Sequence, residues 1–453
     1  MWLLSTDRAE LRWFTEAGSV PGGYAILSHT WGTDEQTLQD VRAINKRYES
    51  SGKNPRDFVS SKIRNCCLLA EKYRYRWVWI DSCCIDKTSS TELSEAINSM
   101  FKWYWQAEVC FAFLADVPSE DDLRAKDSAF RKSRWHKRAW TLQELIAPAV
   151  VIFFSNHWVQ LGTKAELAEL LEEVTRIPQC ILTRQEYYHH TSVANRMSWA
   201  ANRMTTRVED QAYCLMGLFN VNMTVIYGEG TRAFRRLQHK IMKHGFSDMS
   251  LFAWGRWLSS SAFGDQGLEL ERNCLVDLYD DSSYLLAPSP SSFLAGFDFT
   301  PAHPHPKQHY PPPNSTGEEN APDLRVPFDG PMEVPTATPN NYGTICRLPV
   351  FEADGVTVAV LLCENLSHEQ IGLLIHHDRD DYDPIRPMHF IGAAFNNVDD
   401  AEQEVLMSYR LVTLGDDLYN LQFNGKPVRA RWRTMYIQAE RQTVKTGFRS
   451  GSF

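Results

Sequence analysis

The stretch that decides the fold is Arg131–Trp158, RKSRWHKRAWTLQELIAPAVVIFFSNHW. It combines a basic run, tryptophans, one carboxylate at Glu144 and a continuous apolar run. Its first half has apolar side chains at helical spacing, namely Trp135, Ala139, Leu142 and Ile146. Pro148 lacks an N–H and clashes with the preceding turn, so the predicted helix ends near Ile146.

The start of this helix has two solutions. Ser133 can cap it, or the first six residues form a separate turn and the helix proper begins near Arg138. In both cases Glu144 is expected on a helix face that also carries Trp140 and Lys137. Because most charged helix positions are solvated, two interpretations of Glu144 stay open: an exposed surface carboxylate or a functional group.

Four apolar runs predict a parallel sheet. The AVVIFF run at 149–154 is β-branched and aromatic throughout, as in strands covered on both faces. Similar runs occupy 24–28, 77–81 and 108–114. Two segments with helical spacing, 59–73 and 93–104, lie between these runs, and a capping-box pattern at Ser89 precedes the second. Strands and helices that alternate in this way predict a parallel sheet with right-handed crossovers.

Candidate site residues follow two of these strands. His29 and Trp31 lie on the loop after the first strand, and Asp81 lies at the end of the second. Open α/β sheets bind ligands at the carboxyl ends of their strands, so we expect these side chains to gather there with the start of the Glu144 helix. The structural alternatives are loop packing for His29 and Trp31, and capping of loop N–H groups by Asp81.

Composition narrows the class of protein. A net charge of −9 over 453 residues argues against a nucleic-acid binder held by phosphate contacts, although the basic run can hold one anionic ligand. The early charges in MWLLSTDRAELRWF predict no signal peptide and no membrane span, so we expect a soluble, cytoplasmic protein. Ten cysteines without a CxxC spacing predict reduced core thiols, with no zinc or other metal site.

The remaining sequence predicts three further regions after an α/β domain at 1–158. Residues 159–246 carry helical patterns and form a helical extension. Residues 300–339 are rich in proline and are expected to be a linker or loop. Short apolar or alternating runs in 247–299 and 340–453 predict a β-rich C-terminal module, interpreted as regulatory or partner-binding.

Three blocks of this chain resemble a known family, the fungal heterokaryon incompatibility (HET) domain. They are YAILSHTWG, WVWIDSCCIDKTSSTELSEAI with its continuation YWQAEVCFAFLADV, and RAWTLQELIAP, in the order of the family. The resemblance runs from Tyr24 to Trp158, and VEDQAYCLMGLFNV and YGEGTRAFRRLQ resemble the helical region that commonly follows. Lys87 and Ala139 depart from the pattern, which leads one to expect glutamine and glycine there.

The HET domain is in turn similar to the TIR domain, which implies a flavodoxin-like, TIR-like parallel sheet. Enzymatic TIR domains cleave NAD between nicotinamide and ribose, and WTLQEL matches the plant WCLxEL helix that carries the catalytic glutamate. The resemblance therefore implies that Glu144 is catalytic. Nicotinamide is a cationic leaving group, so a carboxylate that stabilises the oxocarbenium-like ribose suits this reaction.

The resemblance also suggests how a nucleotide is held and what the protein does. Its substrate-binding residues are expected to be Ser28, His29, Trp31, Asp81, Arg138 and Trp140. Trp31 or Trp140 would stack on a base, and Arg134, Lys137 or Arg138 would meet the pyrophosphate.

The expected role is fungal nonself recognition and programmed cell death through NAD hydrolysis. NAD would be a substrate rather than a cofactor, with self-association and an unknown protein trigger. The alternatives are a non-catalytic signalling scaffold and a nucleotide-binding domain without turnover.

Overall fold

The structure is a computed structural model of the chain. It describes residues 1–244, 248–258, 268–270, 283–296, 299–302, 327–329, 332–341, 343–377, 387–397 and 407–439. The chain divides into two compact units, Met1–Thr191 with Asn202–Leu237, and Ser192–Ala201 with Gln238–Phe453. Each unit is described by itself below.

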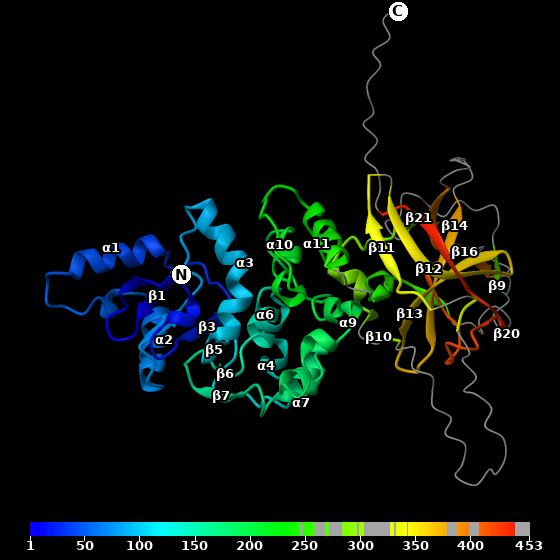
Figure 1. Cartoon of the computed structure of the whole chain (residues 1–453). Coiled ribbons are helices and arrows are strands. Elements are labelled where there is room, and N and C mark those ends of the chain that lie inside the picture. Colours follow the sequence, from blue (N-terminus) through cyan, green and yellow to red (C-terminus); the bar gives the residue numbers. More distant parts are fainter. Residues whose placement is uncertain are drawn as a thin grey trace, which may run out of the picture. The chain divides into compact units, whose positions relative to one another are not determined.

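The first unit contains a seven-stranded sheet in the order β2-β1-β4-β3-β5-β6-β7 (Figure 1). Its four central strands are parallel: β3 (Ala25–His29), β4 (Trp77–Trp79), β5 (Val109–Phe113) and β6 (Val151–Phe154). These strands confirm the predicted α/β class. The edges are antiparallel additions that the sequence did not predict: β1 (Trp2–Ser5), β2 (Leu11–Trp13) and β7 (Gln160–Thr163). The sheet is therefore mixed rather than purely parallel.

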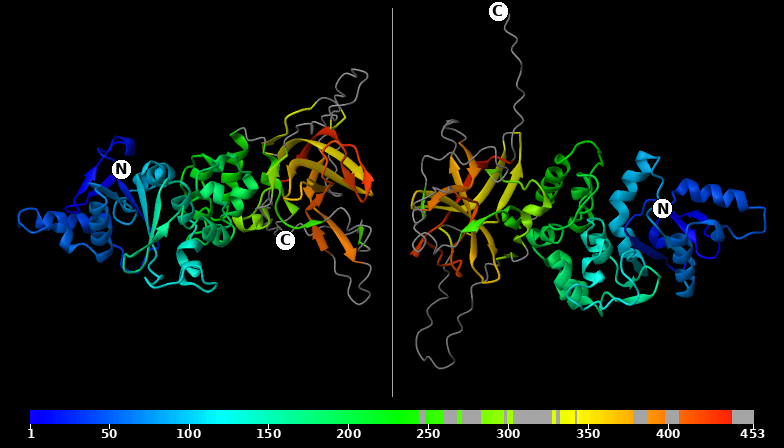
Figure 2. Two further views of the ribbon diagram at one scale, coloured as in Figure 1. Left: turned by 90° about the horizontal axis from the view of Figure 1, so that it is seen from below. Right: turned by 180° about the vertical axis from the view of Figure 1, so that it is seen from behind.

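Helices cover both faces of this sheet. After β3 the chain forms α1 (Leu38–Tyr48) and α2 (Ser61–Lys72) before β4, and α3 (Ser90–Gln106) then leads to β5 on the other side of β3. Right-handed crossovers that change direction in this way place α2 and α3 on opposite faces, as Figure 1 and Figure 2 show. Ser89 caps α3 by accepting from the backbone N–H of Glu92 at 3.2 Å. Because strand order reverses between β3 and β5, a crevice is expected at their carboxyl ends.

The segment before β6 is broken into α4 (Ala129–Lys132), α5 (Arg134–Lys137) and α6 (Thr141–Ile146). Ser133 caps α5, and a separate turn precedes the Glu144 helix, as the second of the two solutions predicted. The break has a long-range cause. The Met204 N–H donates to Lys137 O at 2.6 Å, and the Ala139 N–H donates to Met204 O at 2.9 Å. Lys137 belongs to α5, so the prediction that it shares a helix face with Glu144 is wrong, whereas Trp140 is the N-cap residue of α6, four positions before Glu144.

Helices follow β7, in the region where the sequence carries helical patterns. They are α7 (Ala168–Thr175), α8 (Gln179–Leu182), α9 (Val193–Ser198), α10 (Asp210–Tyr213) and α11 (Arg232–Lys243). Helix α9 belongs to the second unit. No helix within the described ranges combines the length and apolar character needed to cross a membrane.

The second unit is built on a nine-stranded sheet, which confirms a β-rich C-terminal region. Its strands are β8 (Trp257–Leu258), β10 (Thr300–Pro301), β11 (Thr336–Pro339), β12 (Thr344–Ala353), β13 (Val356–Glu364), β14 (Gln370–His377), β15 (Met388–Ile391), β18 (Leu411–Thr413) and β21 (Arg431–Ile437). Two smaller sheets pair β9 (Leu268–Leu270), β16 (Ala393–Asn397) and β17 (Met407–Tyr409), and β19 (Gln422–Phe423) with β20 (Lys426–Pro427). Strands β10 and β11 fall inside the range predicted as a linker; its middle, 303–326, lies outside the described residues.

A buried arginine ties the strands of this unit to its irregular segments. Arg410 is 2% exposed, and its guanidinium donates to Tyr284 O at 2.6 Å and Leu285 O at 2.8 Å. It also lies 3.6 Å from the centre of the Trp254 ring. Burial lowers the pKa of Arg410 well below its ordinary value. Backbone carbonyls and an indole face thus replace the hydration that the cation loses.

We expect Arg410→Met to lower the free energy of unfolding of the second unit by about 2–4 kcal/mol, because buried carbonyls lose their donors. Denaturant titration of the full chain measures this loss. The matched control is Arg433→Met, whose side chain is 43% exposed and pairs with Glu352. That substitution should change stability by less than about 1 kcal/mol. Equal effects of the two substitutions would contradict the role assigned to Arg410.

Candidate functional site

Glu144 lies on α6 beneath the carboxyl end of β3 and is buried, with 3% of its surface exposed. Every residue of α6 is buried, so the interpretation of Glu144 as a solvated helix carboxylate is wrong. Within the part of the chain that the structure describes, no basic side chain forms an ion pair with Glu144. An uncompensated carboxyl in such surroundings is favoured in its neutral form.

Three side chains from other elements surround this carboxyl, and together with it they form the Glu144 cluster: Ser28, Tyr104 and Trp135. The Trp135 indole N–H donates to Ser28 Oγ at 2.7 Å, and the Ser28 hydroxyl donates to Glu144 Oε2. The Tyr104 hydroxyl donates to Leu27 O at 2.9 Å and also faces Glu144. Ser28 is thus part of the site because it binds Glu144, and it does not face solvent.

The protonation of Glu144 follows from this environment. Burial and the nearby negative charge of Asp81 raise its pKa to about 8, against the opposing effects of Ser28, Arg138 and Tyr104. Glu144 is therefore mostly protonated at neutral pH. A pKa raised by several units is typical of a group with a chemical role, because structural carboxylates are more often ionised and paired.

His29 is held between two carboxylates directly beside this cluster. Its ring nitrogens lie 3.6 Å from Glu35 Oε2 and 3.7 Å from Asp81 Oδ1, and its side chain is 1% exposed. Both distances are too long for hydrogen bonds. Burial alone would raise the pKa of Glu35, but contacts with His29, Lys62 and the Gly32 N–H lower it to about 2. His29 is thus an interior residue and has no exposed surface for a ligand.

Trp31 is the exposed aromatic group of the site, with 39% of its surface accessible. Its indole N–H donates to Asp81 Oδ2 at 2.7 Å. The Lys87 ammonium lies 3.9 Å from the centre of the ring, and the Arg138 guanidinium lies 6.0 Å from it. These contacts fix the ring at the carboxyl end of β3. Lys87, which departs from the HET pattern, therefore packs on the candidate stacking residue.

A hollow of about 240 Å³ opens beside Trp31. We call it the basic hollow; it is lined by Thr30 and Trp31 after β3, by Arg134, Lys137 and Arg138 of the α5 region, and by Met204–Thr206. The β-bridge between Arg138 and Met204 joins the last two walls. Positive charge and an indole in one concave site suit an anionic, aromatic ligand.

The basic hollow and the Glu144 cluster are neighbours, but they are separate in this structure. Glu144 and Ser28 are not among the residues that line the hollow. Arg203 connects the two, because its guanidinium donates to Arg138 O and Thr141 Oγ1, both at 3.0 Å, and its charge acts on Glu144. A ligand in the hollow would reach Glu144 only after the side chains between them move.

Trp140 takes a different position from the one expected. Its side chain lies beside the Asp210 carboxyl, which accepts from the Tyr227 hydroxyl at 3.0 Å. Trp140 is not among the residues that line the basic hollow. Trp140 thus connects α6 to Asp210 in the VED segment and, through Tyr227, to the YGEG segment. Of the expected binding residues, Trp31 and Arg138 line the hollow, while Ser28, His29, Asp81 and Trp140 do not.

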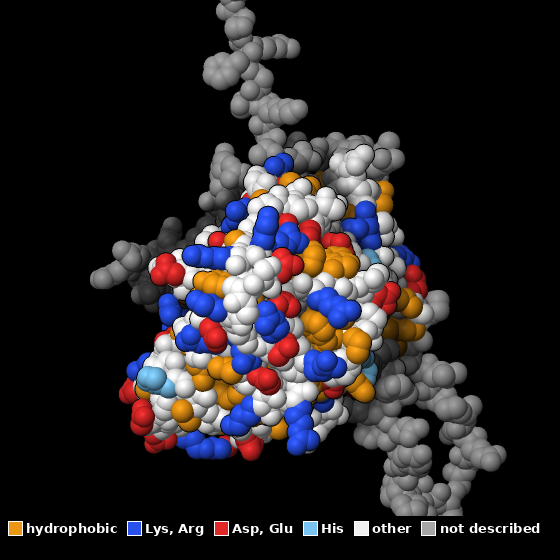
Figure 3. Space-filling view, turned by 90° about the vertical axis from the view of Figure 1, so that its left-hand side faces the viewer, with side chains coloured by type: hydrophobic (Ala, Val, Ile, Leu, Met, Phe, Trp, Pro, Cys, Tyr) orange, Lys and Arg blue, Asp and Glu red, His pale blue; other side chains and the backbone are white. Residues whose placement is uncertain are grey.

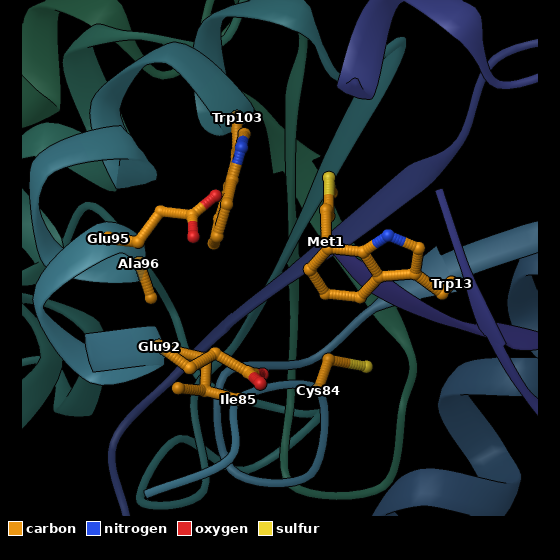
Figure 4. Close-up of a pocket in the computed structure, with 8 residues that line it drawn as sticks. All are labelled: Met1, Trp13, Cys84, Ile85, Glu92, Glu95, Ala96 and Trp103. Carbon is orange, nitrogen blue, oxygen red and sulfur yellow. The ribbon is translucent and has the colours of Figure 1, made fainter. Parts of the chain in front are cut away.

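A second, much smaller hollow lies between the N-terminal strands and α3. Figure 4 shows the rings of Trp13 and Trp103 on opposite sides, with the Glu95 carboxylate beside Trp103 and the Glu92 carboxylate below the two rings. Its volume is about 10 Å³, room for about one water molecule. The basic hollow is therefore the better ligand site of the two. The face seen in Figure 3 carries interspersed basic and acidic side chains with small hydrophobic areas between them.

Met204, Thr205 and Thr206 are site residues that sequence reasoning missed. They directly follow Arg203, and no motif marks them. They reach the hollow through the backbone pairing with Lys137 and Ala139, a contact over more than sixty positions that periodicity does not encode. The neighbouring Arg203 is half-buried and donates to Thr141 of the TLQEL helix.

Comparison with known proteins gives the family context. Residues 24–128 match the family model described as "Heterokaryon incompatibility protein (HET)". Residues 232–310 match "Domain of unknown function (DUF8212)". The first match includes Ser28, His29, Trp31 and Asp81 but ends before α5 and α6, so Glu144 lies outside it.

One curated relative is "Vegetative incompatibility protein HET-E-1" of Podospora anserina, 45% identical over 239 residues. The match covers 50% of this chain and 16% of the relative, so the chain spans only a small part of the relative's length. No solved structure matches the chain. This chain therefore contains a segment that matches the HET family model and is similar to part of one vegetative incompatibility protein.

Proposed function

We propose that this protein, which carries a HET segment at residues 24–128, acts in heterokaryon incompatibility by hydrolysing NAD at the nicotinamide–ribose bond. The observation that carries the proposal is a buried carboxyl, Glu144, near a basic hollow with an indole wall. The vegetative incompatibility relative supports the biological part of the proposal. Programmed cell death would follow from loss of NAD in the cytoplasm.

The strand order of the sheet supports a nucleotide site at the carboxyl ends of β3 and β5. Numbered along the chain, the four parallel strands have the spatial order 2-1-3-4, which corresponds to β4-β3-β5-β6. Flavodoxin-like folds share this order and bind their ligand at the carboxyl ends of the first and third strands. Here those strands are β3 and β5, and Ser28 and His29 end β3. This agreement supports the flavodoxin-like, TIR-like part of the proposal.

In the proposed complex the basic hollow holds the nucleotide. A base stacks on Trp31, and Arg138 binds the pyrophosphate with charge-assisted hydrogen bonds. Trp31 suits this role because Asp81 and Lys87 already hold its ring in place. A preorganised ring loses little conformational entropy on binding.

Glu144 acts when it is ionised and reaches the ribose. The bond between C1 of the ribose and the nicotinamide nitrogen breaks, its electron pair neutralises the pyridinium ring, and water adds to C1. The Glu144 carboxylate stabilises the positive charge that develops on the ribose and takes the proton from the attacking water. Because Ser28 now bonds to Glu144, the active form requires a local opening of this contact. Self-association or a protein trigger would supply that change.

NMR of NAD incubated with the purified full chain tests the proposal. We expect nicotinamide and ADP-ribose to appear in equal amounts, with a rate per molecule that rises with protein concentration or crowding. The same incubation with heat-denatured protein is the control. If NAD is unchanged at every protein concentration and under crowding, the hydrolase proposal is wrong.

Trp31→Ala should weaken nucleotide binding by about tenfold or more, because a stacked base contributes about 1–3 kcal/mol. Isothermal titration calorimetry with ADP-ribose measures this change. Trp105→Ala is a matched control, since Trp105 is 40% exposed in the same unit and lies outside the lining of the basic hollow. Equal affinities of the two variants would remove Trp31 from the binding site.

A second candidate function is nucleotide binding without turnover. The separation of Glu144 from the basic hollow, with Ser28 bonded to the carboxyl, favours it. In that case the α/β unit senses a nucleotide and signals to partners. Calorimetric binding together with unchanged NAD in the NMR assay distinguishes this candidate from the first.

A further inference from the structure

The charge of the basic hollow is one-sided. Three of its lining side chains, Arg134, Lys137 and Arg138, are cationic, and none of its lining residues is acidic. Arg134 is partly neutralised, because its Nε lies 3.4 Å from Asp116 Oδ2. In the part of the chain that the structure describes, Lys137 and Arg138 form no ion pair with a carboxylate. At least two full positive charges are therefore available to one ligand.

Hydroxyl groups complete the polar surface of the hollow. Thr30, Thr205 and Thr206 line it, and each can donate to a phosphate oxygen. The Asp81 carboxylate lies beside Trp31, and its Oδ2 already accepts from the Trp31 indole N–H at 2.7 Å. The lining thus offers donors and cations to a ligand but no carboxylate acceptor.

This composition discriminates between nucleotides. Sites that select a free ribose 2′-hydroxyl use an aspartate or glutamate as the acceptor, whereas sites that accept a 2′-phosphate use a basic residue in its place. A pyrophosphate carries about two negative charges, and a phosphomonoester adds between one and two more at neutral pH. The basic hollow has the cations for the second anionic group and lacks the acceptor that would select against it.

We propose that the basic hollow prefers a dinucleotide that carries a phosphomonoester in addition to its pyrophosphate, so that NADP binds more tightly than NAD. In this mode Arg138, beside Trp31, meets the pyrophosphate, and Lys137 meets the phosphomonoester. The preference rests on the proposed nucleotide-binding function of the hollow and adds the substrate class to it.

Calorimetric titration of the full chain with NADP and with NAD tests this preference. It is done in the Glu144→Gln background, so that hydrolysis does not consume the ligand. We expect NADP to bind about tenfold more tightly at low salt, and the ratio to shrink as salt screens the added charge pairs. Lys137→Ala should remove most of the ratio. The matched control, Lys132→Ala, should keep it, because Lys132 is 62% exposed, pairs with Asp127 and does not line the hollow.

Each other outcome overturns the inference. Equal affinities for the two dinucleotides, tighter binding of NAD, or a preference that Lys137→Ala leaves unchanged would each contradict it. Wild-type NAD cleavage, measured separately by NMR, shows whether the proposed function fails as well. Cleavage of NAD with equal affinities overturns only the preference, whereas no binding and no cleavage overturn both.

Discussion

Glu144→Gln is expected to reduce nicotinamide release from NAD by a factor on the order of 10²–10³, which is the loss typical when one charge-stabilising group is removed. Glutamine has nearly the size of glutamate and can still accept from the Ser28 hydroxyl. It cannot carry the negative charge that stabilises the ribose cation. The activity should therefore disappear while the fold is unchanged, as measured by circular dichroism and by calorimetric binding of ADP-ribose.

The matched control for this result is Glu169→Gln. Glu169 lies on α7, is 61% exposed and pairs with Arg124 on the surface. That variant should release nicotinamide at the wild-type rate. Equal loss of activity in both variants, or full activity in Glu144→Gln, would contradict the catalytic role of Glu144.

The same substitution should stabilise the protein at alkaline pH. The folded-state pKa of Glu144 is raised to about 8, from about 4.5 in the unfolded chain. Below pH 4.5 both states bind the proton and the group has no effect. Between pH 4.5 and 8 the unfolded state loses its proton first, so folding becomes less favourable as pH rises. The full loss above pH 8 is about 3–5 kcal/mol.

Glutamine does not titrate, so Glu144→Gln should escape this loss. The difference in free energy of unfolding between variant and wild type should grow from pH 5 to pH 8 and then level off. Denaturant titrations of both proteins at pH 5, 6.5, 8 and 9 measure it, with Glu169→Gln as a control that should follow the wild type. A difference independent of pH would show that Glu144 is ionised in the folded protein.

The local pattern of the sequence predicted the central sheet. The runs that became β3, β4, β5 and β6 are continuously apolar, so their burial on both faces could be inferred from composition alone. The antiparallel edges were missed. β1 is only four residues long, and two of the three residues of β2 are exposed, so neither shows a pattern. Edge strands are defined by their pairing, which a local pattern does not contain.

The site was predicted in part, for a similar reason. The order of the strands brought Trp31, Asp81 and α6 to one edge, as expected. The burial of Glu144 depends on Ser28, Tyr104 and Trp135, which come from three other elements. The helix break depends on Met204, which pairs with the backbone near Arg138. Such contacts override helical periodicity and appear only in the folded chain.

The proposed catalytic carboxyl of Glu144 is held by a hydrogen bond from Ser28. Ser28 must release Glu144 before the carboxylate reaches the ribose, so the isolated protein at low concentration should be nearly inactive. A closed site of this kind suits an effector that acts only after a trigger. The raised pKa of Glu144 is consistent with activation by a trigger. Burial raises this pKa, so opening of the contact with Ser28 favours ionisation of Glu144, and ionisation in turn favours the open form.

The most direct test follows NAD cleavage by wild type and Glu144→Gln in parallel, at rising protein concentration and under crowding, with nicotinamide measured by NMR. The account predicts that the wild-type rate per molecule rises with concentration while the variant stays at the background of denatured protein. Equal rates of nicotinamide release in the two proteins at every concentration would contradict it.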